Sequence, residues 1–99
     1  MRIGSTPTHV FTLPFNTDVV DVVQILYKQG TDILLELDES DCEMTGNTIS
    51  TVLTQEDTFL FTGGGIVDIQ LRVKTTDGTV LASNIMRVSA EQCLSDEVI

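Results

Sequence analysis

What this sequence has least of is side chains that carry out chemistry. It contains no tryptophan, one histidine (His9) and two cysteines, Cys42 and Cys93. A catalytic site of the Ser-His-Asp or Cys-His kind would have to use His9, and no motif surrounds that residue. Two distant cysteines and one histidine also make a poor zinc-binding set. We therefore interpret His9 as an ordinary surface or edge-strand residue, and we expect no enzyme activity, no cofactor and no small-molecule substrate.

Basic residues are scarce as well. The chain has five lysines and arginines against 15 aspartates and glutamates, which gives a net charge of −10. Nucleic-acid binding requires lysines and arginines that displace counterions from phosphates, so this balance argues against it. An anionic membrane surface is disfavoured by the same sign of charge. The acids suit a solvated exterior, and a partner with a basic surface stays open.

Long apolar runs are missing as well. No segment approaches the ~20 apolar residues of a membrane span, and residues 1–7 contain no apolar signal-peptide core. We therefore expect synthesis in a cytoplasm, with Cys42 and Cys93 as free thiols packed like small buried hydrophobic side chains.

What is present suffices for one small domain. The chain has 99 residues, of which 41% are hydrophobic, a fraction typical of globular domains. With four phenylalanines and one tyrosine, the core must be mostly valine, isoleucine and leucine, which fit pleated strands. We expect one β-sandwich domain over residues 1–99, with residues 1–7 and 90–99 loosely ordered.

The clearest pattern runs from Val67 to Val88. Apolar and polar residues alternate strictly from Val67 to Lys74, Asp77-Gly78 follows, and another apolar-rich run starts at Val80. This predicts a β-hairpin with one buried face. A capping-box turn is expected over residues 54–57. About seven strands at spacings of 8–12 residues predict an all-β sandwich or barrel. We expect them at 8–13, 19–28, 33–37, 42–45, 49–53, 67–74 and 80–88, with a return to β structure at 59–61. In the strand at 33–37 we expect Ile33, Leu35 and Leu37 to face inward.

The hairpin allows two registers. A two-residue loop, Asp77-Gly78, pairs Val73 with Ala82 and Asp68 with Arg87, and it puts Asn84 at an inward position. A three-residue loop starting at Thr76 shifts every pair by one and turns Ser83 and Arg87 inward. We prefer the first register, with Asn84 at a bulge or a sheet edge.

The best local candidate for a metal site is an acidic segment formed by Asp38, Glu39, Asp41 and Glu43. Clustered carboxylates on a loop can chelate Ca²⁺. The segment lacks the glycine and the terminal glutamate of an EF-hand loop, so the preferred interpretation is a solvated loop.

Residues 19–28 are apolar on both sides of the expected strand. Val23, Ile25 and Tyr27 alternate on one side, while the other side is partly apolar too. A strand covered on both faces indicates contact with a partner chain. The candidate contact residues are Val20, Val22, Leu26 and, from the next strand, Leu34.

The second half of the chain carries a family resemblance. Its residues are Leu53 to Thr58, Phe61, Gly65, Ile69 to Arg72, Asp77-Gly78 and Ser83-Asn84. This series resembles small phage and prophage structural proteins of Gram-positive bacteria, and the immunoglobulin-like N-terminal domain of baseplate upper proteins. The resemblance implies an immunoglobulin-like antiparallel sandwich without catalytic residues. Because the family's long fibre-like extension is absent, it implies a stand-alone accessory subunit.

Two functions stay open on this basis. The first is a non-enzymatic structural or docking subunit of a phage or prophage particle, made in the bacterial host cytoplasm and then carried in the virion. Its partners would be other phage structural proteins or further copies of itself. The alternative is a soluble sandwich module that binds a carbohydrate or a peptide.

Overall fold

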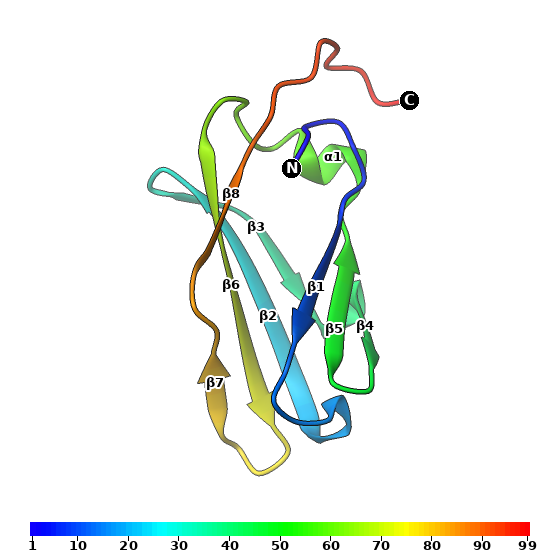
Figure 1. Ribbon diagram of the computed structural model, residues 1–99, viewed down its shortest axis with the longest axis vertical. Helices are drawn as coiled ribbons and strands as arrows, with labels where there is room; N and C mark the ends of the chain where they lie inside the picture. Colours follow the sequence, from blue (N-terminus) through cyan, green and yellow to red (C-terminus); the bar gives the residue numbers. More distant parts are fainter.

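The computed structural model describes residues 1–99 as two antiparallel sheets packed face to face (Figure 1). The three-stranded sheet has the order β1-β5-β4, and in the five-stranded sheet β3-β2-β6 continues to β7 and β8, which both pair with β6. The strands are β1 (Thr8–Thr12), β2 (Val20–Gln29), β3 (Asp32–Asp38), β4 (Cys42–Thr45), β5 (Thr48–Val52), β6 (Ile66–Thr75), β7 (Val80–Ala82) and β8 (Met86–Ser89). The helices are η1 (Thr17–Val19), η2 (Glu39–Asp41) and α1 (Gln55–Thr58), none of which could span a bilayer.

The path of the chain is immunoglobulin-like, as expected. Hairpins join β2 to β3 and β4 to β5, and the chain changes sheet between β1 and β2, β3 and β4, and β5 and β6. This is the order of strands B, C, C′, D, E, F and G of the immunoglobulin fold, with β7 and β8 as two halves of the last strand. In an immunoglobulin domain strand A lies beside strand B. Here no strand lies beside β1 on the side away from β5.

The final hairpin uses both of the registers that the sequence allows. Next to the turn, Val73 pairs with Leu81 and Gly78 has φ +89°, so the loop has three residues and the expected two-residue loop is wrong there. Farther along, Val67 pairs with Val88 and Asp68 with Arg87, as predicted. The one-residue shift is absorbed between β7 and β8, at the expected irregularity around Asn84.

The core lies between the sheets and consists mostly of aliphatic side chains, as predicted. Val23, Ile25 and Tyr27 of β2 are buried against the alternating set of β6 and against the inner residues of β1 and β5. The buried residues of β6 and the three-stranded sheet are Val67, Ile69, Leu71, Val73, Phe11, Ile49 and Thr51.

Three local expectations are corrected. A bulge shifts the pairing of β2 with β3 between Tyr27 and Lys28. Ile33 therefore lies opposite Lys28 and is 57% exposed instead of facing inward. Residues 59–61 form turns instead of a strand, although Phe61 is buried. Cys93 is exposed rather than buried, while Cys42 is half-buried, and both thiols are free.

The two terminal segments lie together. The backbone N–H of Ile3 donates to the carbonyl of Glu91 at 3.0 Å, and the N–H of Glu91 donates to the carbonyl of Met1 at 2.9 Å. Ile3 and Ala90 are buried. The segments that the sequence leaves as loosely ordered therefore make backbone contacts with each other up to residue 91.

Candidate protein-contact surface

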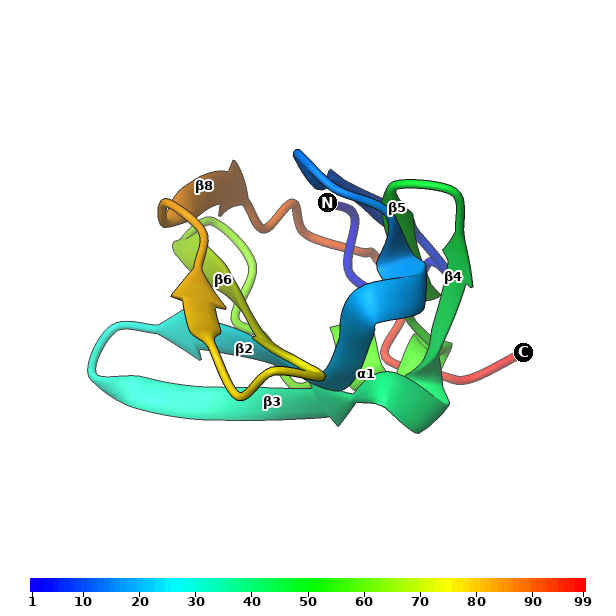
Figure 2. The ribbon, with the colours of Figure 1, turned by 90° about the horizontal axis from the view of Figure 1, so that it is seen from below.

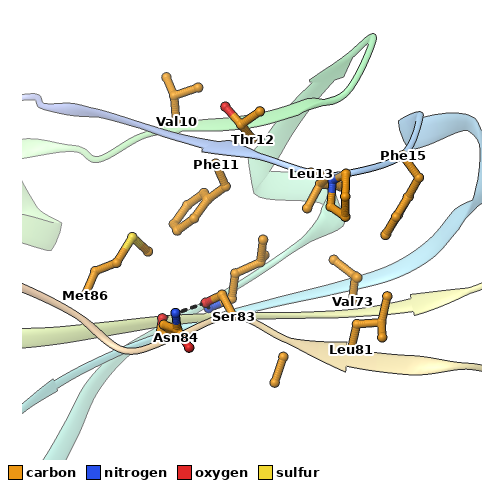
Figure 3. Close-up of a pocket in the computed structure, with 13 residues that line it drawn as sticks. Val10, Phe11, Thr12, Leu13, Phe15, Val73, Leu81, Ser83, Asn84 and Met86 are labelled. Atoms are coloured by element: carbon orange, nitrogen blue, oxygen red, sulfur yellow. Dashed lines mark hydrogen bonds between the residues drawn. The ribbon is translucent and has the colours of Figure 1, made fainter.

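An apolar groove opens along one side of the sandwich, between β1 and the segment from β7 to β8. Its volume is about 560 Å³, and nine of its 13 lining residues are hydrophobic. Figure 3 shows Phe11, Leu13 and Phe15 pointing from one wall toward Val73, Leu81 and Met86 on the other. We call this the open side.

The first wall follows from the alternation of β1. Phe11 and Leu13 face the other sheet and are buried, whereas Val10 points away and is 59% exposed. Leu13 N–H donates to Asn47 at 2.7 Å, and Leu53 N–H donates to the carbonyl of Pro7 at 2.9 Å. Because antiparallel pairing alternates, the odd-numbered residues of β1 bond to β5. The N–H and C=O groups of Thr8, Val10 and Thr12 therefore point off the free edge.

The second wall is shaped by the bulge between β7 and β8. Ser83 Oγ accepts from the N–H of Leu71 at 3.0 Å and donates to the carbonyl of Asn84 at 2.9 Å. Leu81 and Met86 on either side are paired with the buried Val73 and Ile69, so they face the sandwich interior. They stay 42% and 38% exposed because no strand of the opposite sheet extends over them.

No charged side chain lines the groove. The acids gather elsewhere: residues 32–43 contain six of them and no base. These residues form β3, η2 and β4, on the opposite side of the sandwich from the open side (Figure 2). The molecule therefore has one strongly acidic side and one uncharged apolar side.

His9 lies on the edge strand as expected, but its ring points inward. Its Nδ1 lies 2.8 Å from the hydroxyl of Tyr27, and the two ring centroids are 5.6 Å apart. This hydrogen bond joins the two sheets. Burial, with the nearby N-terminal charge, lowers the pKa of His9. Burial, followed by the charges of Cys42 and Asp57, raises the pKa of Tyr27. The His9 ring makes no hydrogen bond to a serine, threonine or cysteine; its hydrogen bond goes to the buried phenol of Tyr27.

Three of the four carboxylates of the acidic segment accept hydrogen bonds from the backbone. Asp38 Oδ1 accepts from Ser40, Asp41 Oδ2 accepts from the N–H of Asp38, and Glu39 Oε2 accepts from the N–H of Val23 at 3.1 Å. The bonds from Ser40 lower the pKa of Asp38. The carboxylates of Asp38, Glu39, Asp41 and Glu43 do not converge, and the fold brings no three metal-ligating side chains together.

The four predicted contact residues do not form one patch. Val20, next to a bulge in the β2–β6 pairing, and Leu34, at the β3 bulge, pack against the core. Val22 and Leu26 lie on the outer face of the five-stranded sheet, and Leu26 borders a shallow hollow of about 230 Å³. Their contact with a partner stays a prediction.

Cys42 lies at the acidic side and is not part of the groove. Its thiol donates to the carbonyl of Asp38 at 3.3 Å. Burial, together with the neighbouring charges of Asp41, Asp38 and Glu39, raises its pKa, which disfavours the reactive thiolate.

Comparison of the chain with protein-family models, with curated proteins and with solved structures finds no match. Neither a chemical motif nor a strand apolar on both sides marks the groove in the sequence. One available signal was the segment Thr8 to Thr12, an uncharged strand without proline in its interior. Natural edge strands usually carry a charge, a proline or a bulge.

Proposed function

We propose that this chain is a non-enzymatic structural or docking subunit of a phage or prophage particle, and that it acts through protein–protein contacts at its open side. The observation that carries the proposal is the groove between β1 and β7–β8, bordered by a strand edge with unpaired backbone groups. Exposed apolar surface beside an unpaired edge favours burial against another chain. The phage context is supported by the resemblance of residues 53–84 described above.

Incorporation into particles tests this function. In a lysogen that carries the gene, an epitope-tagged copy of the chain should be found in purified particles. Leu81→Asp places a charge in the groove and should reduce incorporation by about tenfold or more, because a buried unpaired charge costs far more than the ~1.4 kcal/mol that tenfold requires. The matched control is Leu60→Asp, since Leu60 is similarly exposed (49% against 42%) but lies outside the groove. Absence from particles, or equal incorporation of both variants, would refute the proposal.

The same groove supports a second candidate, the peptide-binding form of the soluble module. An extended peptide can add to a free strand edge while its apolar side chains enter a pocket. The polar lining side chains are Thr12, Ser83 and Asn84, which is few for a carbohydrate with many hydroxyls. A peptide-library selection that yields extended apolar peptides, lost in Leu81→Asp, would favour this candidate over the particle subunit.

A further inference from the structure

We infer that the partner on the open side is a second copy of this chain, joined by antiparallel pairing of β1 with β1 of the other copy. This inference rests on the proposed function, since it names the partner for the same surface. Three observations support it. They are the protection of each of the four sheet edges against pairing, the register that β1 permits, and the distribution of charge over the surface.

The edge of β1 is the one that lacks protection against pairing. The outer edge of β3 carries Asp32, Glu36 and Asp38, and β4 carries Glu43. The edge formed by β7 and β8 is broken by the bulge between them and consists of segments of three and four residues. By contrast, β1 has five residues in continuous register with β5, without a charge, a proline or a bulge. Charges, bulges and short strands are the features that prevent edge-to-edge association.

The sequence of β1 fits a two-fold axis centred on Val10. The unpaired backbone groups belong to Thr8, Val10 and Thr12, so an antiparallel partner strand must form its hydrogen bonds with these three residues. When the partner is a second copy, the same three residues form the bonds on its side. Placing Val10 opposite Val10 of the second copy puts Thr8 opposite Thr12 in both directions. These three pairs are then hydrogen-bonded pairs of the antiparallel ladder, in which the two residues exchange both N–H···O=C bonds. An interface between identical chains must be self-complementary in this way.

The distribution of charge also favours association of two copies through the open side. Each chain has a net charge of −10, and six acids lie on the β3–η2–β4 side, away from β1 (Figure 2). Pairing through β1 keeps these two acidic sides apart, whereas pairing through β3 or β4 would juxtapose them. Because β1 and β7 border the same groove, the two-fold axis also brings the two open sides together, so exposed Leu81 and Met86 lie at the joint.

Cysteine cross-linking tests the register directly. Val10→Cys, in a Cys42→Ser/Cys93→Ser background, should form a disulfide-linked dimer on mild oxidation, because hydrogen-bonded antiparallel pairs have Cα atoms about 5.5 Å apart, within disulfide range. Val52→Cys is the matched control, since Val52 is equally exposed (61% against 59%) but lies on the neighbouring strand β5. In mixtures, Thr8→Cys should cross-link to Thr12→Cys and not to itself. Equal cross-linking of the Val10 and Val52 variants would overturn the inference.

Val10→Pro supplies an independent measurement. The N–H of Val10 has no partner within the chain, so proline there removes a donor that only the dimer uses. Sedimentation equilibrium should show a dimer for the wild type and a dissociation constant raised about tenfold or more in the variant, consistent with the loss of ladder hydrogen bonds. A wild type that stays monomeric up to about 1 mM, where association would be very weak, would overturn the inference. If the wild type is monomeric and Leu81→Asp still fails to enter particles, the dimer is wrong and the docking function stands. If the chain forms the β1 dimer but is absent from particles, the docking function is wrong and the dimer stands.

Discussion

His9 and Tyr27 form the polar link between the two sheets. His9 comes from β1 and Tyr27 from β2, and Tyr27 also packs on Phe61 with ring centroids 6.0 Å apart. In antibody domains the corresponding part of the core holds a tryptophan on strand C and a disulfide between the sheets. Here the thiols are free, and a hydrogen bond between a histidine and a tyrosine joins the sheets instead.

The free energy of unfolding should depend on pH through His9. Because the folded state lowers the pKa of His9 below 6.5, the unfolded chain binds the proton more readily. Stability is therefore constant above about pH 6.5, falls as the pH drops below 6.5, and levels off below the pKa of the folded state. Urea titrations between about pH 8 and pH 5 measure this decrease.

His9→Asn is the matched variant for this test. The asparagine amide can occupy the place of Nδ1 and keep a hydrogen bond to Tyr27, but it does not titrate. We expect its stability to be flat over the same pH range. If the wild type and His9→Asn show the same slope, the decrease comes from another group and His9 does not couple pH to folding.

At the scale of the elements, α1 shows how a very short helix is held in place. Thr54 Oγ1 accepts from the N–H of Asp57 at 3.1 Å, and Asp57 Oδ2 accepts from the N–H of Thr54 at 3.0 Å. This is the capping box that the sequence predicts at 54–57. The following Thr58 is fully buried, and its hydroxyl accepts from the N–H of Gly4 at 2.9 Å, so α1 also holds the N-terminal segment.

Thr54→Ala removes the cap and should lower the free energy of unfolding by about 0.5–2 kcal/mol. Thr54→Ser keeps the accepting oxygen and should recover most of that loss. Thr62→Ala is a control, because the exposed Thr62 makes no hydrogen bond through its side chain. Chemical denaturation measures all three. A loss in Thr62→Ala as large as in Thr54→Ala would mean that the cap contributes nothing specific.

The sequence predicts the strands well and their irregularities poorly. Alternation identifies β2 and β6 because every second residue must be apolar on a half-buried strand. A bulge changes which residues face inward without changing composition, so Ile33 is predicted to be inward and is exposed. The hairpin is similar: neither register alone keeps Asn84, Ser83 and Arg87 off the buried face, and the structure changes register between β7 and β8.

The groove was beyond sequence analysis for a different reason. Phe11, Leu13 and Leu81 have the pattern of ordinary core residues, and they do face the interior. They line a groove because the three-stranded sheet ends at β1 while the facing sheet continues to β7 and β8. The pattern of one strand cannot reveal how many strands cover it, since coverage depends on pairing between distant segments.

At the scale of the whole molecule, net charge and surface pattern oppose each other. The open side favours association through apolar contact and free backbone groups, whereas two chains of charge −10 repel each other. Repulsion between distant surface charges is screened by salt, with a Debye length of about 30 Å at 0.01 M and about 3 Å at 1 M. The contacts at β1 involve no charged group, so salt leaves them intact.

Self-association should therefore strengthen as salt rises. Between about 0.01 M and about 1 M sodium chloride we expect the dimer dissociation constant to fall several-fold, because screening removes repulsion that acts over roughly 30 Å at the lower concentration. Sedimentation equilibrium at each salt concentration measures the change. An interface built on ion pairs would behave in the opposite way and weaken with salt.

The variant Asp32→Asn/Glu43→Gln separates screening from a salt effect on apolar contacts. Both side chains are exposed, make no hydrogen bond and lie away from β1, so the substitutions remove two negative charges without altering the open side. This variant should bind itself more tightly at low salt and show a shallower salt dependence than the wild type. If the two proteins respond to salt identically, repulsion between the acidic sides does not oppose association, and the separation of charge from the open side has no energetic role.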